Sequence, residues 1–407
     1  MPSINDCIIL HGPDLVPHHC SRFSWVNDTV TAIELGQKVS ELPTQGDGAR
    51  VIIPGLYNSH THMGDSVLPD GATGLTLEQG FFRPHGYKYR ELAKLTEETH
   101  LPHVAAHLRY MARTGHLDFR EQGPAGARLL RRASEQTGVQ SVVLGQFDSV
   151  PFSLEQLRAN REPFSSEARS ELDALLAVAD GFSESTMNDL TDEAWRELRR
   201  VTTELGKLRA IHCLENTGYR DVSLEITGRG DLIRAIELYD PHIIVHLTVA
   251  NAEEIALLVS TQKTGVLNPR ANANLGLPLP PVAALLKAGA NLLLGTDNGL
   301  LNSPSMLAEL DFTYKLAKSQ FGDALQPNPT EILKMATCNI RPVLGGDHYG
   351  YLEKGLPASF AVLNFKQAHL KASRHLIASI LTRVTPEDVL ATYRLGKPLW
   401  AAPGIEI

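Results

Sequence analysis

The sequence predicts an α/β fold in which a closed (β/α)8 barrel stands beside a small β domain built from both ends of the chain. Three observations support this prediction. From Pro54 to about residue 344, short apolar strand segments alternate with longer helical segments. The alternation repeats about eight times, which is the number of strands that closes such a barrel. Residues 1–53 and 345–407 instead contain short β-type stretches bounded by turn residues such as Gly.

Eight short apolar segments are the candidate barrel strands. They begin at Leu56, Gly115, Val139, Ala177, Leu208, Ile243, Thr264 and Asn291. Helical patterns lie between them, for example SSEARSELDALLAV with Ser165 or Ser166 as its N-cap, NAEEIALLVSTQ, and LPPVAALLKAGA ending at Gly289. An open, doubly wound sheet is the competing arrangement. No G-x-G-x-x-G motif follows the first strand, which weakens a dinucleotide-binding version of that sheet. We therefore expect a barrel over residues 54–344 and a small β unit over 1–53 and 345–407.

Composition limits the classes of function. The 407 residues carry a net charge of −8 and are 43% hydrophobic, which is typical of a soluble globular protein and argues against a nucleic-acid polymer as partner. No apolar run approaches the ~18 residues of a membrane span, and we expect no secretory signal from MPSINDCIIL. The four cysteines lack paired short spacings, so we expect free thiols in a reducing cytoplasm.

Two histidines follow the first candidate strand directly, in the stretch PGLYNSHTHMGDS. Residues i and i+2 of a strand share a face, so His60 and His62 are predicted to point together into the barrel mouth. Active sites of such barrels lie at the carboxyl ends of the strands. Two imidazoles held on a rigid strand suit a divalent metal. The alternative is a pair of polar residues in a turn after the strand.

The fifth candidate strand ends in AIHCLEN, with His212 at its end and Glu215 three residues later. In a continuous strand these two residues would face apart. However, the strand should end near Cys213, so that the following loop can bring Glu215 back over the mouth. The alternative is a strand-end histidine beside a solvent-facing glutamate.

The sixth and eighth strands each supply one more candidate. His246 follows three β-branched residues in IIVHLTVAN, where a lone histidine is more often a satisfied core residue. Asp297 ends NLLLGTD, where an aspartate after Gly-Thr is also a common turn or cap residue. Ser303 and Pro304 already supply a cap and first turn for the next helix, so Asp297 is not needed for that task.

The signals become specific when they are combined. All five candidates fall at the ends of strands one, five, six and eight in the same strand count: His60, His62, His212, His246 and Asp297. Unrelated core residues and turns would not be expected to share this placement. The sequence therefore predicts a metal site at the barrel mouth.

On these residues the chain resembles the amidohydrolase superfamily, in particular its cytosine/guanine deaminase and triazine-hydrolase-like branch. The motifs PGLYNSHTHMGDS, IHCLEN, VHLT, NPRAN, GTDNGLLNSP and EILKMATCNIRPVLG occur in the order of that branch and extend over nearly the whole chain. The resemblance implies a (β/α)8 TIM barrel with a small β-sandwich domain formed by both termini. It also implies one bound divalent metal, zinc or else iron(II).

The resemblance further implies roles for individual residues. Glu215 resembles the proton shuttle of the family, and His246 resembles the histidine that polarises the metal-bound water or contacts the metal. Asp297 resembles the base that accepts the proton of the water. Two-metal members use a carboxylated lysine on the fourth strand, and the segment AVADGF holds none, which favours a single metal. The implied metal ligands are His60, His62, His212 and Asp297.

Residues for substrate binding have weaker signals. The segment LEQGFFRPHGYKYR after the first strand is a long loop, in which Phe82 and Arg83 are predicted to cover a heterocycle; the alternative is an ordinary packed loop. The branch often has C-P-x-S-N where this chain has NPRAN, so an altered pocket is expected there. The remaining candidates near strand ends are Asp65, Glu121, Asn188, Arg270 and Asn272.

The residues and the resemblance together predict hydrolytic deamination of an aminated nitrogen heterocycle, such as a pyrimidine, purine, pterin or nucleoside derivative, with release of ammonia. The same acid–base set would serve hydrolysis of a cyclic amide or of a chlorinated or alkylamino ring. A non-catalytic relative that binds or assembles is an alternative of another class, although it would not need the full residue set. We expect a small heterocyclic substrate, no membrane partner and, as in the resembling family, a homo-oligomer.

Overall fold

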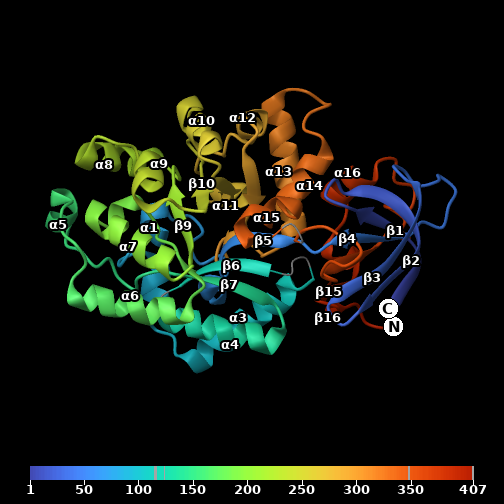
Figure 1. The fold of residues 1–407 in the computed structure, drawn as a ribbon, viewed down its shortest axis with the longest axis horizontal. Coiled ribbons are helices and arrows are strands. Elements are labelled where there is room, and N and C mark those ends of the chain that lie inside the picture. Colours follow the sequence, from blue (N-terminus) through green and yellow to red (C-terminus); the bar gives the residue numbers. More distant parts are fainter. Residues whose placement is uncertain (114–116, 123, 347–348, 406–407) are drawn as a thin grey trace.

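A computed structural model of the chain describes residues 1–113, 117–122, 124–346 and 349–405, with the side chains of 117–122 and 124 outside the description. Two sheets organise these residues (Figure 1). One is a parallel sheet from the middle of the chain. The other combines strands from both ends, and Figure 1 shows its blue and red strands side by side at the right.

The parallel sheet closes into a barrel. Its strand order is β12-β11-β10-β9-β8-β7-β6-β5-β13. Only Gly295 and Thr296 separate β12 from β13, so the nine assigned strands act as eight, and the parallel pairing of β13 with β5 joins the two edges. The predicted (β/α)8 TIM barrel is confirmed. Its strands are β5 (Tyr57–His62), β6 (Leu117–Gln122), β7 (Gln140–Gly145), β8 (Gly181–Phe182), β9 (Leu208–Cys213), β10 (Ile243–His246), β11 (Thr264–Leu267), β12 (Asn291–Leu294) and β13 (Asp297–Asn298).

Helices follow the barrel strands and cover the outside of the barrel (Figure 1). The longer ones are α3 (Glu97–Met111), α4 (Pro124–Thr137), α6 (Ser166–Val178), α7 (Asp192–Glu204), α8 (Thr217–Thr227), α10 (Ala252–Ser260) and α13 (Met306–Phe321). Shorter helices are α1 (Leu77–Phe81), α2 (Tyr87–Leu92), α5 (Leu154–Ala159), α9 (Asp231–Arg234), α11 (Pro269–Asn274), α12 (Val282–Lys287), α14 (Pro329–Met335), α15 (Arg341–Leu344) and α16 (Leu376–Thr382). Single turns are η1 (Met63–Val67), η2 (Met187–Asp189), η3 (Ala235–Tyr239), η4 (Cys338–Ile340) and η5 (Pro386–Asp388).

The barrel interior is a packed apolar layer below the mouth. Ala210, Val245, Val266 and Leu293 from neighbouring strands form one buried cluster inside the sheet. A larger cluster fills the space between the sheet and the surrounding helices. In the ranges that the structure describes, no helix has the length and apolar character needed to span a membrane.

The second sheet curls over on itself. Its order is β16-β15-β14-β4-β1-β2-β3, so β2 is not a sheet neighbour of β14 or β15. Nevertheless Trp25 of β2 packs edge-on against Phe360 of β14 and Tyr393 of β15, with ring centroids 5.0 Å and 5.1 Å apart. The sheet thus encloses its own aromatic core, as the expected terminal sandwich requires. Its strands are β1 (Ser3–His11), β2 (Val16–Val26), β3 (Thr29–Lys38), β4 (Arg50–Pro54), β14 (Phe360–Asn364), β15 (Val389–Arg394) and β16 (Lys397–Ala401).

The domain boundaries after residues 53 and 344 stay a prediction. Both ends of the chain do contribute strands to one sheet, as the composition of the ends suggests. All four cysteines are buried free thiols. Cys7 and Cys20 lie opposite each other on β1 and β2.

The fourth strand is shorter than its sequence suggests. The apolar run from Ala177 was predicted to start the strand, but Ala177 and Val178 end α6, and β8 covers only Gly181–Phe182. The buried face of α6, which includes Leu175 and Leu176, extends the helix into that run. The predicted N-cap Ser165 is confirmed, since its side chain accepts a hydrogen bond from the backbone of Ala168.

A second correction concerns the start of α13. Ser303 and Pro304 were predicted to begin this helix, but its first residue is Met306. The N-cap is Ser305, whose hydroxyl accepts a hydrogen bond from the Ala308 N–H at 3.3 Å. The helix therefore starts later than expected, and the residues after Asp297 instead form a turn in which the Leu301 and Asn302 N–H groups donate to the Asn298 carbonyl.

The Trp25→Ala variant tests the closure of the terminal sheet. Trp25 is 1% exposed and its indole N–H donates to the Gly396 carbonyl at 3.0 Å. Removing it should cost about 3–5 kcal/mol, as for other buried tryptophans, and lower the thermal unfolding midpoint followed by circular dichroism. The control Val26→Ala changes a neighbouring side chain that is 37% exposed. Equal midpoints for the two variants would contradict this account of the sheet.

Candidate active site

The carboxyl ends of the barrel strands bring five titratable side chains into one mouth. His60 and His62 lie on β5, His212 on β9, His246 on β10 and Asp297 on β13. All five residues are buried, with between 1% and 6% of their surface exposed. Side chains that are far apart in the sequence therefore share one protected site.

Asp297 lies between the two histidines of the first strand. Its Oδ1 atom is 3.4 Å from His60 Nε2 and 3.5 Å from His62 Nε2. The His60 ring centroid is 4.8 Å from the ring centroids of both His62 and His212. The i, i+2 spacing on β5 thus places both imidazoles on the same side of the strand.

Glu215 returns over the mouth, as the sequence predicts. β9 ends one residue before Leu214, which adopts a left-handed backbone with φ 58° and reverses the chain. The Leu214 N–H donates to the fully buried Asp231 carboxylate at 2.8 Å, which fixes the turn. Glu215 Oε1 then lies 3.8 Å from His246 Nε2, and that nitrogen lies 3.2 Å from His212 Nδ1.

A left-handed backbone also directs two of the five side chains. Val245 belongs to the barrel-interior cluster, so the next residue, His246, would face outward in a regular strand. Its φ of 80° breaks the alternation and turns the imidazole toward His212, while Asp297 has φ 59°. Such conformations cost a residue with a side chain about 1–3 kcal/mol each and persist only where the surroundings hold them.

Three overlapping groups in the mouth have the donors for a metal ion. Within each group the ligand atoms lie within 4.8 Å of one another. The groups are His60–His62–His212, His60–His246–Asp297 and His212–Glu215–His246. Imidazole nitrogens and carboxylate oxygens are ligands that zinc and iron(II) take in proteins. The donor chemistry and the spacing of this cluster therefore fit a divalent cation.

The charges in the cluster favour ionised Asp297. Burial alone would raise the pKa of its carboxyl group, but the hydrogen bond with His60 and the positive charge on the surrounding histidines outweigh burial and hold the pKa well below its usual range. The Thr61 hydroxyl donates to the Asp297 carbonyl at 2.9 Å and fixes the backbone. The anionic carboxylate is suited to bind a cation.

The described residues also form a cleft of about 500 Å³. It includes Asn216, the residue after Glu215, and its walls come from the segment around α1, from α5 and from α8. Phe82 and Tyr219 stack in it with ring centroids 5.7 Å apart and an interplanar angle of 21°. The volume lies in the range of small-molecule sites.

Comparison with known proteins decides the family. A match to the amidohydrolase family covers residues 51–399. The chain belongs to the amidohydrolase family. The match spans the barrel and most of the C-terminal strands, so the family assignment applies to the part of the chain that forms the site.

Individual proteins are similar over most of their length. A protein of Methanothermobacter thermautotrophicus named "Putative aminohydrolase" is 32% identical over 393 residues, 96% of each chain. A 5-methylthioadenosine/S-adenosylhomocysteine deaminase of Thermoanaerobacter pseudethanolicus is 24% identical over 379 residues, which cover 91% of this chain and 86% of that protein. An adenosine deaminase structure from Xanthomonas campestris with bound zinc has a TM-score of 0.82 at 20% identity, covering 97% of this chain and 92% of that one. The last likeness shows the fold.

Phe82 and Arg83 of this amidohydrolase have different surroundings. Phe82 is 37% exposed and lines the cleft. The Arg83 side chain is only 4% exposed; it donates to Asp189 Oδ2 at 2.7 Å and to Glu184. The guanidinium charge is thus compensated within the protein, and Arg83 fastens the segment before α2 to the end of the fourth strand.

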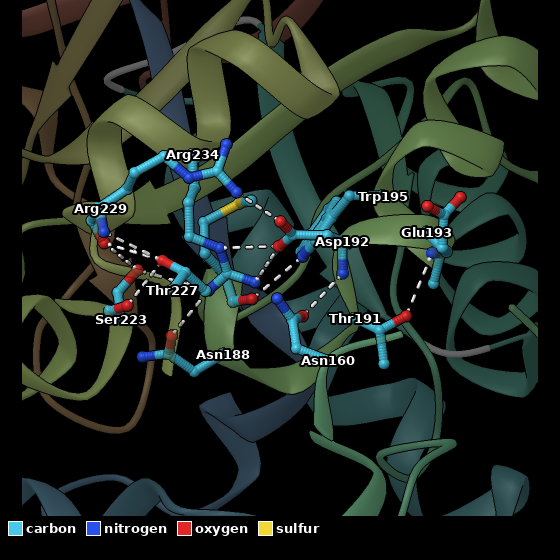
Figure 2. Close-up of polar contacts among 12 residues, drawn as sticks. Asn160, Asn188, Thr191, Asp192, Glu193, Trp195, Ser223, Thr227, Arg229 and Arg234 are labelled. Carbon is cyan, nitrogen blue, oxygen red and sulfur yellow. Dashed lines mark hydrogen bonds and ion pairs between the residues drawn. The ribbon is translucent and has the colours of Figure 1, made fainter. Parts of the chain in front are cut away.

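Asn188 lines the cleft but is held by a buried network, shown in Figure 2. Its amide nitrogen donates to the Tyr219 carbonyl at 2.9 Å, and its oxygen accepts from Arg234 at 3.1 Å. Arg234 in turn pairs with Asp192 at 2.8 Å, and Arg229 pairs with the same carboxylate. The network joins η2 and α7 to α8, which carries the aromatic wall of the cleft.

The NPRAN segment also makes contacts within the protein. The Arg270 guanidinium lies 3.5 Å from Glu309 Oε2, and the backbone N–H of Arg270 donates to Glu309 Oε1 at 3.2 Å. Asn272 is 1% exposed and its amide donates to the Thr248 hydroxyl at 3.0 Å. The side chain of Glu121 lies outside the described residues.

Sequence reasoning missed several charged groups near the mouth. Lys88 is buried against Asp65, and Glu184 is buried at the end of β8. Burial raises the pKa of Glu309 on α13 to about 7, although Arg270 opposes the shift. Glu184 comes two residues after the fourth strand, and the segment AVADGF already marked the end of that strand, so a search of the residues after each strand could have found it. Lys88 and Glu309 lie in helices and have no spacing that marks them.

The Gly295→Ala variant tests the packing behind His60. A Cβ atom at Gly295 would lie 2.7 Å from both the Cβ and the carbonyl oxygen of His60, and 2.6 Å from Asn268 Oδ1. Because the His60 contacts include backbone, the methyl group should displace β5. We expect a lower unfolding midpoint and, if the cluster holds a divalent metal, weaker binding of that metal, measured by equilibrium dialysis. In the control Gly80→Ala, the nearest atom would lie at an ordinary 3.6 Å. A wild-type unfolding midpoint in the Gly295 variant would refute the tight packing.

Proposed function

We propose that this amidohydrolase is a metal-dependent deaminase that releases ammonia from an aminated nitrogen heterocycle, such as a pyrimidine, purine, pterin or nucleoside derivative. One observation carries the proposal: four histidines and two carboxylates converge in a buried cluster at the carboxyl end of the barrel. A protein that only binds or assembles has no need to bury so many titratable groups together, because their desolvation is costly.

The proposed metal ligands are His60, His62, His212 and Asp297, and zinc is the proposed cation, with iron(II) as the alternative. When bound, such a cation lowers the pKa of a coordinated water from 15.7 to about 7 and so supplies the nucleophile. The imidazole and carboxylate donors of the mouth support this choice. The zinc in the adenosine deaminase of the same fold supports it as well.

The residues around the metal ligands can then move the protons. Asp297 accepts a proton from the attacking water as the new carbon–oxygen bond forms. Glu215 donates a proton to the ring nitrogen that receives the electron pair of the ring C=N bond. Asp297 then passes its proton to the amino group, the carbon–nitrogen bond breaks with release of ammonia as the hydroxyl oxygen forms a C=O bond, and the hydroxyl proton returns to Glu215. His246, in contact with His212 and near Glu215, polarises the water.

The cleft supports a flat substrate that is larger than a bare ring. Phe82 and Tyr219 provide aromatic surface near Glu215, and the outer walls include apolar residues such as Leu157 and Val222. Of the substrate-binding candidates, we propose that Phe82 contacts the substrate directly. Contact by Glu121, Arg270 and Asn272 stays a prediction, while Arg83 and Asn188 shape the cleft through the ion pairs and hydrogen bonds that hold them.

The names of the relatives support removal of an amino group. One similar protein is named "Putative aminohydrolase" and another is named as a deaminase of 5-methylthioadenosine and S-adenosylhomocysteine. We also propose that the protein works in the cytoplasm, which the buried free cysteines support. A homo-oligomer stays a prediction.

The proposed function is tested by measuring bound metal and then ammonia release across a panel of amino-heterocycles and nucleosides. About one metal per chain, together with ammonia from at least one compound, would support the proposal. Metal without ammonia would favour hydrolysis of a cyclic amide or of a chlorinated or alkylamino ring, which the same panel can include. A purified protein that binds no metal would favour the scaffold alternative.

The Glu215→Gln and Asp297→Asn variants separate the two carboxylates. Loss of the proton shuttle should lower ammonia release by about 10²–10⁴-fold while bound metal, measured by mass spectrometry, stays near one per chain. Loss of the Asp297 carboxylate should lower both activity and metal content. The control Glu225→Gln changes an exposed glutamate at the rim of the same cleft. Near-normal turnover in either site variant would remove that residue from the mechanism.

A further inference from the structure

A buried carboxylate lies directly beneath the residues that follow Asp297. Asp65 is on η1, three residues after His62, and is fully buried. Its Oδ2 atom accepts a hydrogen bond from the Asn298 amide at 2.6 Å, and its Oδ1 atom accepts one from the Leu300 N–H at 3.1 Å. One side chain thus holds the chain at two points just after the Asp297 position.

The segment held by Asp65 is the one that must stay fixed for Asp297 to reach the histidines. Asp297 has a left-handed backbone, and it is anchored by the short pairing of β13 with β5, in which Asn298 lies opposite His62, and by the hydrogen bond from the Thr61 hydroxyl. Gly299 packs so closely on η1 that a Cβ atom there would lie 2.8 Å from Ser66 Cβ. The turn after Asp297 and η1 are therefore pressed together, with Asp65 as the hydrogen-bond acceptor between them.

Lys88 supplies the countercharge for Asp65. Its ammonium nitrogen lies 3.1 Å from Asp65 Oδ2, and its side chain is 8% exposed. Burial favours the neutral amine, but the negative charge of Asp65 outweighs burial and raises the pKa of Lys88. Lys88 is on α2, in the same segment as Phe82 and Arg83. The segment that lines the cleft with Phe82 and Arg83 therefore also supplies the countercharge of Asp65.

We propose that Asp65 and Lys88 are positioning residues that hold Asp297 in the conformation required for the metal. This inference rests on the proposed function, because it assigns a role toward the proposed metal. It departs from the sequence-based expectation that Asp65 contacts substrate, because the Asp65 carboxylate instead binds Asn298, Leu300 and Lys88. Removal of groups that orient ligands typically lowers metal affinity about 10–100-fold.

A buried ion pair that only stabilises the fold is the competing explanation. Such a pair would change the unfolding midpoint without changing how the site binds a metal. Zinc affinity and the visible absorption of bound cobalt(II) separate the two explanations, since the cobalt spectrum responds to the ligands and their arrangement. Neither measurement requires a known substrate.

The experiment compares the full-length wild type with Asp65→Asn, Lys88→Met and Asn298→Ala. We expect zinc to bind at least about tenfold more weakly to Asp65→Asn, with an altered cobalt spectrum, and a smaller change in the same direction for Lys88→Met. Asn298→Ala removes one hydrogen-bond donor to Asp65 and leaves the ion pair with Lys88 in place. This variant therefore still tests the positioning role if the other two variants fail to fold. The control is Lys263→Met, which breaks a more exposed lysine–aspartate pair, with Asp240 at 2.5 Å, beside the opposite ends of β10 and β11.

The outcomes distinguish this inference from the proposed function. Weaker zinc binding and changed cobalt spectra in the site variants, with a wild-type site in Lys263→Met, would support the positioning role. Wild-type zinc affinity and spectra in all folded site variants would overturn it and leave the proposed function intact. A wild-type protein that binds neither zinc nor cobalt would overturn both.

Discussion

The pairing of β13 with β5 is the interaction on which the candidate site depends. It closes the barrel and places Asp297 opposite Thr61 and Asn298 opposite His62. Asn58 on β5 reinforces the closure, since its side chain accepts from the Thr296 N–H at 3.0 Å and donates to the Thr296 hydroxyl at 2.7 Å. Without this strand pairing, the first and last barrel strands would carry their ligand candidates on two separate edges of an open sheet.

Charged groups around the mouth are compensated in pairs. Lys88 pairs with Asp65, Arg83 with Glu184 and Asp189, and Arg270 with Glu309. Burying such pairs costs desolvation energy that well-packed apolar residues would avoid, so they are weak stabilisers of a fold. Their shared feature is that each joins one loop or helix at the mouth to another, which fixes the positions of segments that lack strand pairing.

The barrel was predictable from the alternation of strand and helix segments, and the mixed origin of the small sheet from the β-type stretches at both ends of the chain. The convergence of the five ligand candidates was predictable because all five lie at strand ends. His60 and His62 follow from strand periodicity alone. Strand periodicity would place His246 on the outside of the barrel. This residue faces the mouth because its backbone is left-handed, and no local sequence pattern predicts that conformation. Lys88 could not be found for a different reason: its role depends on a contact with Asp65 that the fold creates. The fourth strand was misplaced because a helix and a buried strand share apolar runs.

The position of Lys88 links the two halves of the site. The segment from α1 to α2 is fastened to the fourth strand by Arg83 and to η1 by Lys88, and Phe82 beside Arg83 lines the cleft. The same segment therefore forms a wall for the proposed substrate and supports the turn after Asp297. Two apolar contacts would also hold this segment in place, but they would not fix its orientation. Ion pairs with hydrogen-bond geometry restrict both the distance and the orientation of the groups that they join. This restriction gives a physical reason to keep buried charges at the mouth, where a displacement of a ligand by a fraction of an ångström matters more than the free energy of unfolding.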